Sequence, residues 1–239
     1  MHLPLSDKIE LNILHQNSHQ AEINKKKFND FKVLCLNIMS SPGSGKTKLL
    51  EKTLEDLSKK IKVAVLEGDM TTTLDAARLE KLNIPVVPIT TGRACHLDAN
   101  MVKGGFKILE SKINPTLLDI LLVENVGNLV CPAEFEIGEH FKVALLSITE
   151  GEDKPLKYPV MFREADLVLI TKVDLLPYLN FDIDELKSNI SLTNPKAEVI
   201  EISSISMTGF DLWKNWISKK IQEFKTVSYT HLTLPTSHN

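Results

Sequence analysis

The feature that most constrains this chain is a glycine-rich loop between an apolar run and a helical segment. Residues 40–47 read Ser-Ser-Pro-Gly-Ser-Gly-Lys-Thr and follow the apolar run 33–39. Strand, glycine-rich loop, Gly-Lys-Thr and helix in this order are typical of a P-loop, whose backbone N–H groups and helix N-terminus surround phosphate oxygens. One position departs from the usual pattern, because Ser40 stands where the first glycine is expected. The alternative, a Gly/Ser turn that leads into a helix by chance, is disfavoured by the matching flanking segments.

The loop residues have separate predicted roles. Lys46 is expected to reach the β- and γ-phosphates of a nucleotide, and the Thr47 hydroxyl is expected to hold Mg²⁺. The residues predicted to bind the phosphates are Gly43, Ser44, Gly45, Lys46 and Thr47. The chain is therefore expected to bind a nucleoside triphosphate together with Mg²⁺.

Apolar runs of strand length recur along the rest of the chain. They lie at residues 63–66, 86–89, 120–123, 143–146, 167–170 and 199–202. Continuous apolar runs that alternate with helical segments indicate buried parallel strands in βαβ units. Together with the P-loop they predict an α/β fold, a three-layer Rossmann-like P-loop NTPase with a mostly parallel central sheet.

The chain divides into three parts by pattern. Residues 1–30 are polar and helix-compatible, and we interpret them as a helical lead-in to the P-loop domain at 31–226, which closes with a helix at 210–224. Residues 227–239 carry no charge apart from histidine protonation and resemble translated adapter sequence, so we interpret them as a non-native tail. The two histidines of this tail are therefore excluded as metal ligands.

Composition excludes several classes of protein. The 239 residues are 43% hydrophobic and 25% charged, with a net charge of −3 that gives no reason to expect nucleic acid as a partner. No apolar stretch approaches the ~18 residues of a membrane span, and the N-terminus lacks the pattern of a secretory signal. The 3 cysteines are far apart, which favours a reducing cytoplasm over a disulfide framework.

A second motif indicates that the base is guanine. The run 167–170 ends in Thr-Lys-Val-Asp, which is similar to the Asn-Lys-x-Asp motif of GTPases with Thr171 in place of asparagine. An aspartate at this place can accept hydrogen bonds from the guanine N1–H and 2-amino groups, which adenine does not offer. The alternative is a Lys/Asp pair on a solvated loop. The residues predicted to contact the base are Lys172, Asp174, Ser203 and Ser204, of which the two serines are the weaker candidates because the usual lysine is missing after them.

Carboxylates follow two of the predicted strands. Asp69 and Glu124 each end a strand, and Asp75 lies a few residues after the first of them. The carboxyl ends of strands beside a P-loop are where Mg²⁺ and the attacking water are held. Each carboxylate has an alternative interpretation as a helix N-cap or a surface charge. The predicted catalytic set is Lys46, Thr47, Asp69, Asp75 and Glu124, and the predicted Mg²⁺ ligands are Thr47, Asp69 and Glu124.

Two cysteines and a histidine form a further candidate group. Cys95 and His96 are adjacent, and Cys131 follows the strand that ends at Glu124. Their spacing is not that of a zinc finger, and two thiolates with one imidazole do not complete a tetrahedron in one chain. A metal site would therefore need ligands from two subunits or a water molecule. The alternative is two small buried apolar side chains and a surface histidine.

Several of these segments together resemble the HypB family, the GTPases of [NiFe]-hydrogenase maturation. The resemblance covers about residues 8–224 and is carried by residues 41–47, 67–69, 95–99, 124–132 and 171–178. It implies a core that dimerises on GTP and a Ni²⁺ or Zn²⁺ site at the dimer interface, formed by Cys95, His96 and Cys131. It also implies a HypA-like nickel chaperone and the hydrogenase large subunit as partners. Asn100 departs from the many relatives that have histidine there, and the N-terminal cysteine-rich nickel site of some members is missing.

We therefore predict a cytoplasmic, metal-regulated GTPase that acts as a nickel metallochaperone for hydrogenase maturation. We also expect GTP to close two subunits and thereby bring the metal ligands together across the interface. Three alternatives stay open: a UreG-like GTPase that inserts nickel into urease, a non-enzymatic nickel-storage protein and a small-molecule kinase. The intact Gly-Lys-Thr and the small number of histidines disfavour storage, and the Thr-Lys-Val-Asp motif disfavours a kinase.

Overall fold

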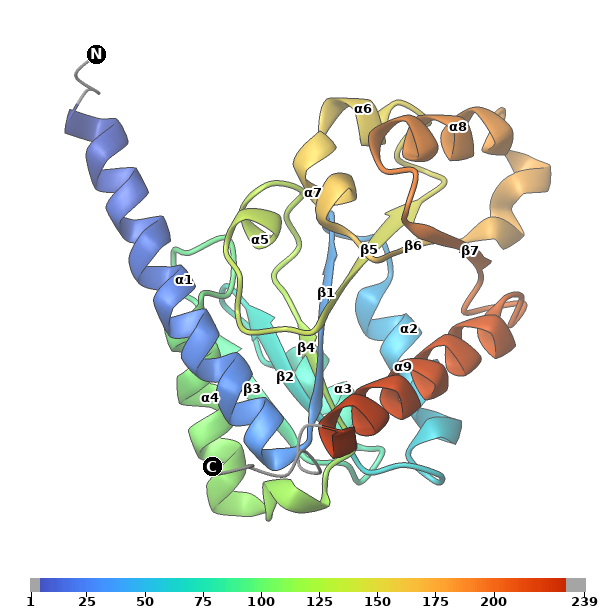
Figure 1. The fold of residues 1–239 in the computed structure, drawn as a ribbon. Coiled ribbons are helices and arrows are strands. Elements are labelled where there is room, and N and C mark those ends of the chain that lie inside the picture. Colours follow the sequence, from blue (N-terminus) through green and yellow to red (C-terminus); the bar gives the residue numbers. More distant parts are fainter. Residues whose placement is uncertain (1–4, 231–239) are drawn as a thin grey trace, which may run out of the picture.

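The structure, a computed structural model, describes residues 5–230 of the chain and contains one seven-stranded sheet (Figure 1). The strands are β1 (Leu34–Ser40), β2 (Val63–Asp69), β3 (Val86–Thr90), β4 (Ile120–Glu124), β5 (Phe141–Ser147), β6 (Leu167–Thr171) and β7 (Glu198–Ile202). Their order is β3-β2-β4-β1-β5-β6-β7, and every pair of neighbouring strands in residues 5–230 is parallel. This confirms the predicted α/β fold with a parallel sheet.

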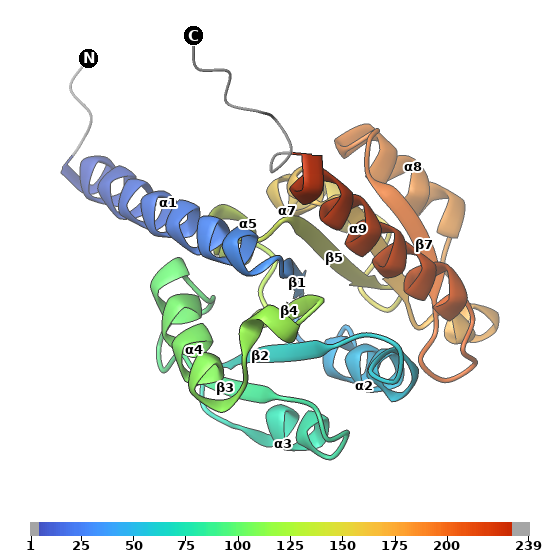
Figure 2. The same ribbon diagram turned by 60° about the horizontal axis from the view of Figure 1, so that its bottom comes forward.

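Helices cover both faces of the sheet and make three layers (Figures 1 and 2). The α-helices are α1 (Leu5–Phe31), α2 (Lys46–Leu57), α3 (Leu74–Glu80), α4 (Ala99–Lys112), α5 (Cys131–Glu134), α6 (Lys154–Lys157), α7 (Pro159–Glu164), α8 (Ile183–Thr193) and α9 (Phe210–Thr230). Short 3₁₀ turns lie at Pro115–Leu117 and Val173–Tyr178. Side chains of α2, α3 and α9 pack on one face of the sheet, and those of α1, α4, α7 and α8 pack on the other.

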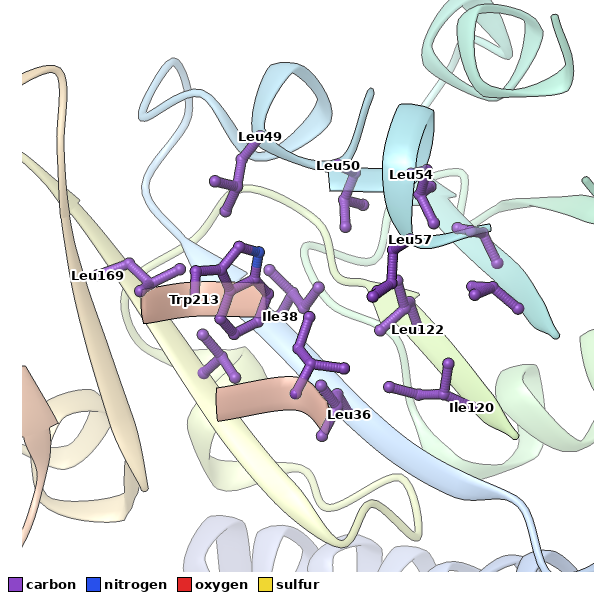
Figure 3. Packing of buried hydrophobic residues seen from close by; sticks show 14 of the residues in the cluster. Leu36, Ile38, Leu49, Leu50, Leu54, Leu57, Ile120, Leu122, Leu169 and Trp213 are labelled. Atoms are coloured by element: carbon purple, nitrogen blue, oxygen red, sulfur yellow. The ribbon is translucent and has the colours of Figure 1, made fainter. Parts of the chain in front are cut away.

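Alternation along each strand divides the core between the two faces. In β1, Leu36 and Ile38 contact the side covered by α2 and α9, whereas Cys35 and Met39 face the opposite helices. Trp213 of α9 is fully buried in the apolar cluster between this side of the sheet and α2 (Figure 3). A strand covered on both faces is mostly apolar, and this is why the central strands are nearly continuous apolar runs in the sequence.

The long helix α1 is attached to the domain by buried amides as well as apolar contacts. Phe28 meets Phe106 of α4 edge-on, with ring centroids 5.0 Å apart. The Asn24 side chain donates to the carbonyls of Ala99 and Ile137 at 2.7 and 3.0 Å. These contacts pair buried polar groups that would otherwise be costly, and they hold α1 along α4.

Two predicted boundaries differ from the structure by a few residues. The lead-in helix extends from residue 5 to residue 31. The closing helix α9 continues to Thr230, so the boundary predicted at residue 226 lies inside a helix rather than after it. The other residues of the predicted tail, 231–239, lie outside the described part, as do residues 1–4. Within residues 5–230, none of the helices combines the length and the apolar character of a membrane span.

The strand order brings the functional segments together. β1 is central, with β4 on one side and β5 on the other, and the P-loop leaves its carboxyl end. Ligands of open α/β sheets bind at such a position, where neighbouring connections leave in opposite directions. The segments that follow β1, β2, β4 and β6 therefore converge on one edge of the sheet.

Candidate functional site

The P-loop forms the base of a cavity of about 540 Å³. Gly43 and Gly45 have φ of 75° and 98°, a left-handed conformation that glycine adopts without a steric penalty. Lys46 begins α2, and its ammonium group donates to the hydroxyl of Ser40 at 2.7 Å. Burial lowers the pKa of Lys46, and the nearby carboxylate of Glu124 opposes that shift. A buried cation thus lies at a helix N-terminus, which is an environment that attracts phosphate.

Two carboxylates lie opposite one another beside this lysine. Glu67 of β2 and Glu124 of β4 are register partners, and their exposed fractions are 2% and 3%. The Thr47 hydroxyl donates to Glu124 Oε1 at 2.7 Å, whereas Oε2 of each glutamate has no hydrogen-bond partner among the described residues. Burial raises the pKa of Glu67 to about 8 and that of Glu124 to about 7. Unpaired buried carboxylate oxygens next to a P-loop threonine are a donor set suited to Mg²⁺.

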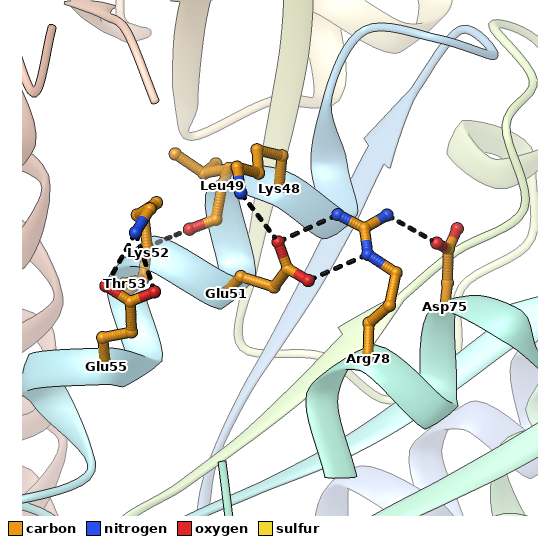
Figure 4. A network of polar contacts seen from close by, with 8 residues as sticks. All are labelled: Lys48, Leu49, Glu51, Lys52, Thr53, Glu55, Asp75 and Arg78. Atoms are coloured by element: carbon orange, nitrogen blue, oxygen red, sulfur yellow. Dashed lines mark hydrogen bonds and ion pairs between the residues drawn. The ribbon is translucent and has the colours of Figure 1, made fainter. Parts of the chain in front are cut away.

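The two predicted aspartates lie at the rim of the same cavity. Asp69 accepts backbone N–H groups of Thr71 and Thr72 at 2.8 and 2.7 Å, and these bonds lower its pKa against the opposing effect of burial. Asp75 accepts from Arg78 at 2.9 Å. The Arg78 guanidinium also donates twice to Glu51 of α2, at 2.8 and 2.9 Å, as Figure 4 shows. Arg78 therefore reaches the cavity, but carboxylates hold its guanidinium.

A second, largely apolar pocket adjoins the P-loop at the end of β6. Its lining residues are Ser44, Gly45, Lys48, Thr171, Lys172, Asp174, Leu175, Ser204 and Ile205. The Thr171 hydroxyl donates to the carbonyl of Ser44 at 2.8 Å, and Lys172 donates to the carbonyl of Gly43 at 2.7 Å. Threonine at the asparagine position of the motif therefore makes a hydrogen bond to the P-loop. This pocket contains most of the residues predicted to contact a base.

Ser203 is a predicted base-contacting residue, and its side chain is hydrogen-bonded to Asp174. The fully buried Ser203 hydroxyl donates to Asp174 Oδ1 at 2.5 Å and accepts the N–H groups of Ile205 and Ser206 at 3.1 and 3.0 Å. It orients the carboxylate rather than lining the pocket. Ser204, the other predicted contact, does line the pocket.

Cys95, His96 and Cys131 come together in one chain. Their ligand atoms all lie within 4.8 Å of one another, with the two Sγ atoms 3.3 Å apart. Closure of two subunits is therefore not needed to gather these ligands, contrary to the expectation from sequence. The reason is that the strand order places the segments after β3 and β4 at the same edge of the sheet. Three ligands leave at least one position of a tetrahedral site open.

The surroundings of this cluster orient its ligands. The His96 ring lies against Phe135, with centroids 4.0 Å apart and the ring planes tilted by 30°. Burial lowers the pKa of His96, which favours the neutral form that binds metals. Burial and the neighbouring thiol raise the pKa of Cys131 to about 11. A metal ion would have to displace that proton. Asn100 is exposed at the start of α4.

Glu67, Arg78 and Asn125 belong to the site but are not among the residues predicted from the sequence. The sequence marks Glu67 only as part of a strand end, yet it faces Glu124 and lines the phosphate cavity. Arg78 and Asn125 also line that cavity. The period-two pattern of β2 could have indicated that Glu67, like Val65, points to a buried face. Nothing in the sequence marks the partners of Arg78 or Asn125.

Comparison with known proteins agrees with this geometry. Residues 34–201 match the nucleotide-binding domain of CobW/HypB/UreG proteins. The chain is 50% identical over 209 residues to hydrogenase maturation factor HypB of Escherichia coli K12, covering 87% of this chain and 71% of that protein. It is 41% identical over 216 residues to the hydrogenase/urease maturation factor HypB of Helicobacter pylori J99, covering 90% of this chain and 88% of the relative.

A solved structure is similar over nearly the same span. The crystal structure of HypB from Helicobacter pylori in complex with nickel superposes with a TM-score of 0.83 at 40% sequence identity. The match covers 87% of this chain and 96% of that one. At this identity the likeness extends beyond the fold to the family.

Proposed function

The chain belongs to the HypB hydrogenase maturation factors of the CobW/HypB/UreG family, and from this premise we propose that it is a GTP hydrolase that delivers nickel. One observation carries the proposal: the carboxyl end of β4 contributes Glu124 to the phosphate cavity, and the segment that follows it contributes Cys131 to the ligand cluster. A phosphate site and a site for a thiolate-binding metal are therefore joined by one short segment.

The proposed hydrolysis depends on positioning and electrostatics. Lys46 and the loop amides bind the phosphates, and Asp174 accepts the guanine N–H groups. Thr47, Asp69 and Glu124 would hold Mg²⁺, and the ion would neutralise charge that develops on the phosphate oxygens. The unpaired oxygen of Glu124 and its contact with the Thr47 hydroxyl support this assignment.

We expect slow intrinsic turnover. Arg78 is the arginine that lines the phosphate cavity, and its guanidinium is paired with Glu51 and Asp75 instead of extending over the phosphates. An arginine placed on the transferred phosphate contributes a factor of about 10³–10⁵ to phosphoryl transfer. Asp75 would change its position only if this ion-pair network reorganised, which suits a role in a nucleotide-dependent switch.

Nickel is the proposed cargo of the protein rather than a resident cofactor. Cys95, His96 and Cys131 supply two thiolates and an imidazole, a set that binds Ni²⁺ and also Zn²⁺. We propose that the open position is filled by water or by a ligand from a second subunit at a GTP-dependent dimer interface. A HypA-like nickel chaperone and the hydrogenase large subunit are the proposed donor and acceptor, in the cytoplasm.

Nucleotide chemistry is tested by Lys46→Ala with a lysine control on the same helix. Lys52→Ala removes an ammonium that pairs with Glu55 at 2.8 Å and lies outside the cavity. We expect the Lys46 variant to lose GTP turnover while it remains folded, and the Lys52 variant to retain it. A folded Lys46→Ala protein with the wild-type rate would exclude this loop as the active site. Equal affinity for ATP and GTP in a competition titration would exclude the proposed base selectivity.

A second candidate is delivery of nickel to urease. The observation that favours it is the Helicobacter pylori relative, which is a maturation factor for both hydrogenase and urease. Both candidates use the same nucleotide and metal sites. They are separated by measuring which apoenzyme, hydrogenase or urease, gains activity when the nickel-loaded protein and GTP are added.

A further inference from the structure

A buried asparagine joins the phosphate cavity to the cysteine–histidine cluster. Asn125 follows Glu124 directly and is fully buried. Its side-chain Oδ1 accepts the N–H of Leu97 and that of Val126, both at 2.9 Å. Its Nδ2 donates to Asn37 of β1 at 3.1 Å, so the amide is paired on both sides.

On the nucleotide side, the segment after Asn125 packs tightly against the P-loop. A Cβ atom on Gly127 would lie 2.9 Å from Cα of Pro42, which is closer than side chains tolerate. The N–H of Asn125 itself donates to the Ile38 carbonyl of β1 at 3.0 Å. The backbone around Asn125 is therefore in direct contact with the loop that surrounds the phosphates, and a displacement of one requires a displacement of the other.

On the cluster side, Asn125 meets both segments that carry the ligands. Leu97 is the next residue after His96, and its N–H is the group that Asn125 accepts. The Leu97 side chain packs on the strand β2, where a Cβ on Gly68 would lie 2.7 Å from Leu97 Cγ. Cys131 lies on the other segment, which begins at Asn125 itself. Asn125 thus contacts the segment that carries Cys95 and His96 through its side chain and is continuous in sequence with the segment that carries Cys131.

We propose that Asn125 is a positioning residue that couples nucleotide state to metal affinity by setting the place of the Cys95–His96 segment relative to Cys131. This inference rests on the proposed function, because it requires both a nucleotide and a metal ion to bind. In this proposal, a γ-phosphate that displaces the end of β4 also displaces the Asn125 side-chain amide. The Leu97 N–H moves with it, because losing its acceptor would leave a buried donor unpaired and would destabilise the fold. The coupling is reciprocal, so bound metal changes nucleotide affinity by the same factor.

The test compares Asn125→Ala with a matched amide in α1. Asn17 is also buried, and its Oδ1 accepts the Ala99 N–H at 2.9 Å, so Asn17→Ala loosens the same segment from the side away from the nucleotide. Nickel affinity is measured by competition with a chromophoric chelator, with Mg²⁺ and a non-hydrolysable GTP analogue and then with GDP. We expect the two affinities of the wild type to differ by about tenfold or more. The ratio of the nickel affinities in the two nucleotide states should fall below about threefold in Asn125→Ala and stay at the wild-type value in Asn17→Ala.

Two results would overturn the proposal. One is an unchanged ratio in Asn125→Ala, and the other is equal nickel affinity in both nucleotide states of the wild type, which removes the coupling but leaves the GTPase intact. A wild type that binds GTP but no nickel would instead remove the metal-delivery function itself.

A measurement on the wild type covers the case in which Asn125→Ala does not fold. Hydrogen exchange of the Leu97 N–H should change between the GDP and GTP-analogue states, whereas the Ala99 N–H, held by Asn17, serves as the internal reference. Equal protection of the Leu97 N–H in both states refutes the role of Asn125 without any reference to nickel.

Discussion

Replacing Glu67 by glutamine should stabilise the free protein at alkaline pH. Glu67 and Glu124 face each other across neighbouring strands, each almost completely buried, and each has an oxygen without a partner in the described chain. Burial first, and then the charge of Glu124, raise the pKa of Glu67 from 4.5 to about 8. Because the folded state retains a proton that the unfolded state releases, stability is greatest below the unfolded pKa and is lost as the pH rises towards 8.

The size of the effect follows from that pKa. One pKa unit corresponds to about 1.4 kcal/mol. Relative to a carboxyl that stays protonated, Glu67 therefore lowers the free energy of unfolding by at most about 4 kcal/mol at pH 8 and by about 1 kcal/mol at pH 5. Glutamine is uncharged at every pH and similar in shape, and its amide can donate to the unpaired oxygen of Glu124. The variant should therefore exceed the wild type in stability at pH 8 and nearly match it at pH 5.

The assay is urea unfolding without Mg²⁺ or nucleotide at both pH values. Glu55→Gln is the control, because Glu55 lies on the surface of α2 with a side chain 45% exposed. It should leave the pH dependence of the wild type unchanged. If Glu67→Gln shows the same change in unfolding free energy between pH 5 and pH 8 as the wild type, the burial argument is refuted. A confirmed result would mean that the phosphate site retains its carboxylates at a cost in stability, as functional sites do.

Three other variants test separate parts of the protein. Asp174→Asn should weaken GTP binding and favour xanthosine triphosphate, since the 2-oxo group accepts from an amide; a competition titration with no change in preference would contradict the base assignment. Cys131→Ala should weaken nickel binding by about tenfold or more, and a chelator titration that finds equal nickel affinity in this variant and the wild type removes Cys131 from the site. Wild-type nickel affinity should also fall at acid pH, because the cysteine thiols must lose their protons to bind the metal. Trp213→Ala should lower the free energy of unfolding by about 3–5 kcal/mol, because it leaves a cavity in the core and removes the 2.9 Å hydrogen bond to Thr53. A loss under about 1 kcal/mol in urea unfolding would show that the packing of α9 on α2 does not depend on Trp213.

Local sequence patterns determined the elements and the phosphate loop. The seven apolar runs predicted the strands because a strand covered by helices on both faces is mostly apolar along its length. Gly43, Gly45 and Lys46 could be assigned to the loop because left-handed turns, helix N-termini and phosphate charge are demands met within a few consecutive residues. The resemblance to HypB was likewise carried by short consecutive segments.

Only the tertiary structure decided which distant residues meet. Glu67 faces Glu124 because of the register between β2 and β4, and Cys95 reaches Cys131 because two connections leave the same edge of the sheet. The Asn125 side chain accepts the Leu97 N–H, and no local sequence pattern predicts this pairing. These contacts depend on strand order and loop path, which are set by the packing of the whole domain rather than by the residues nearby in sequence. The sequence thus determined the parts of the site that one segment builds, and the fold decided the parts that two segments share.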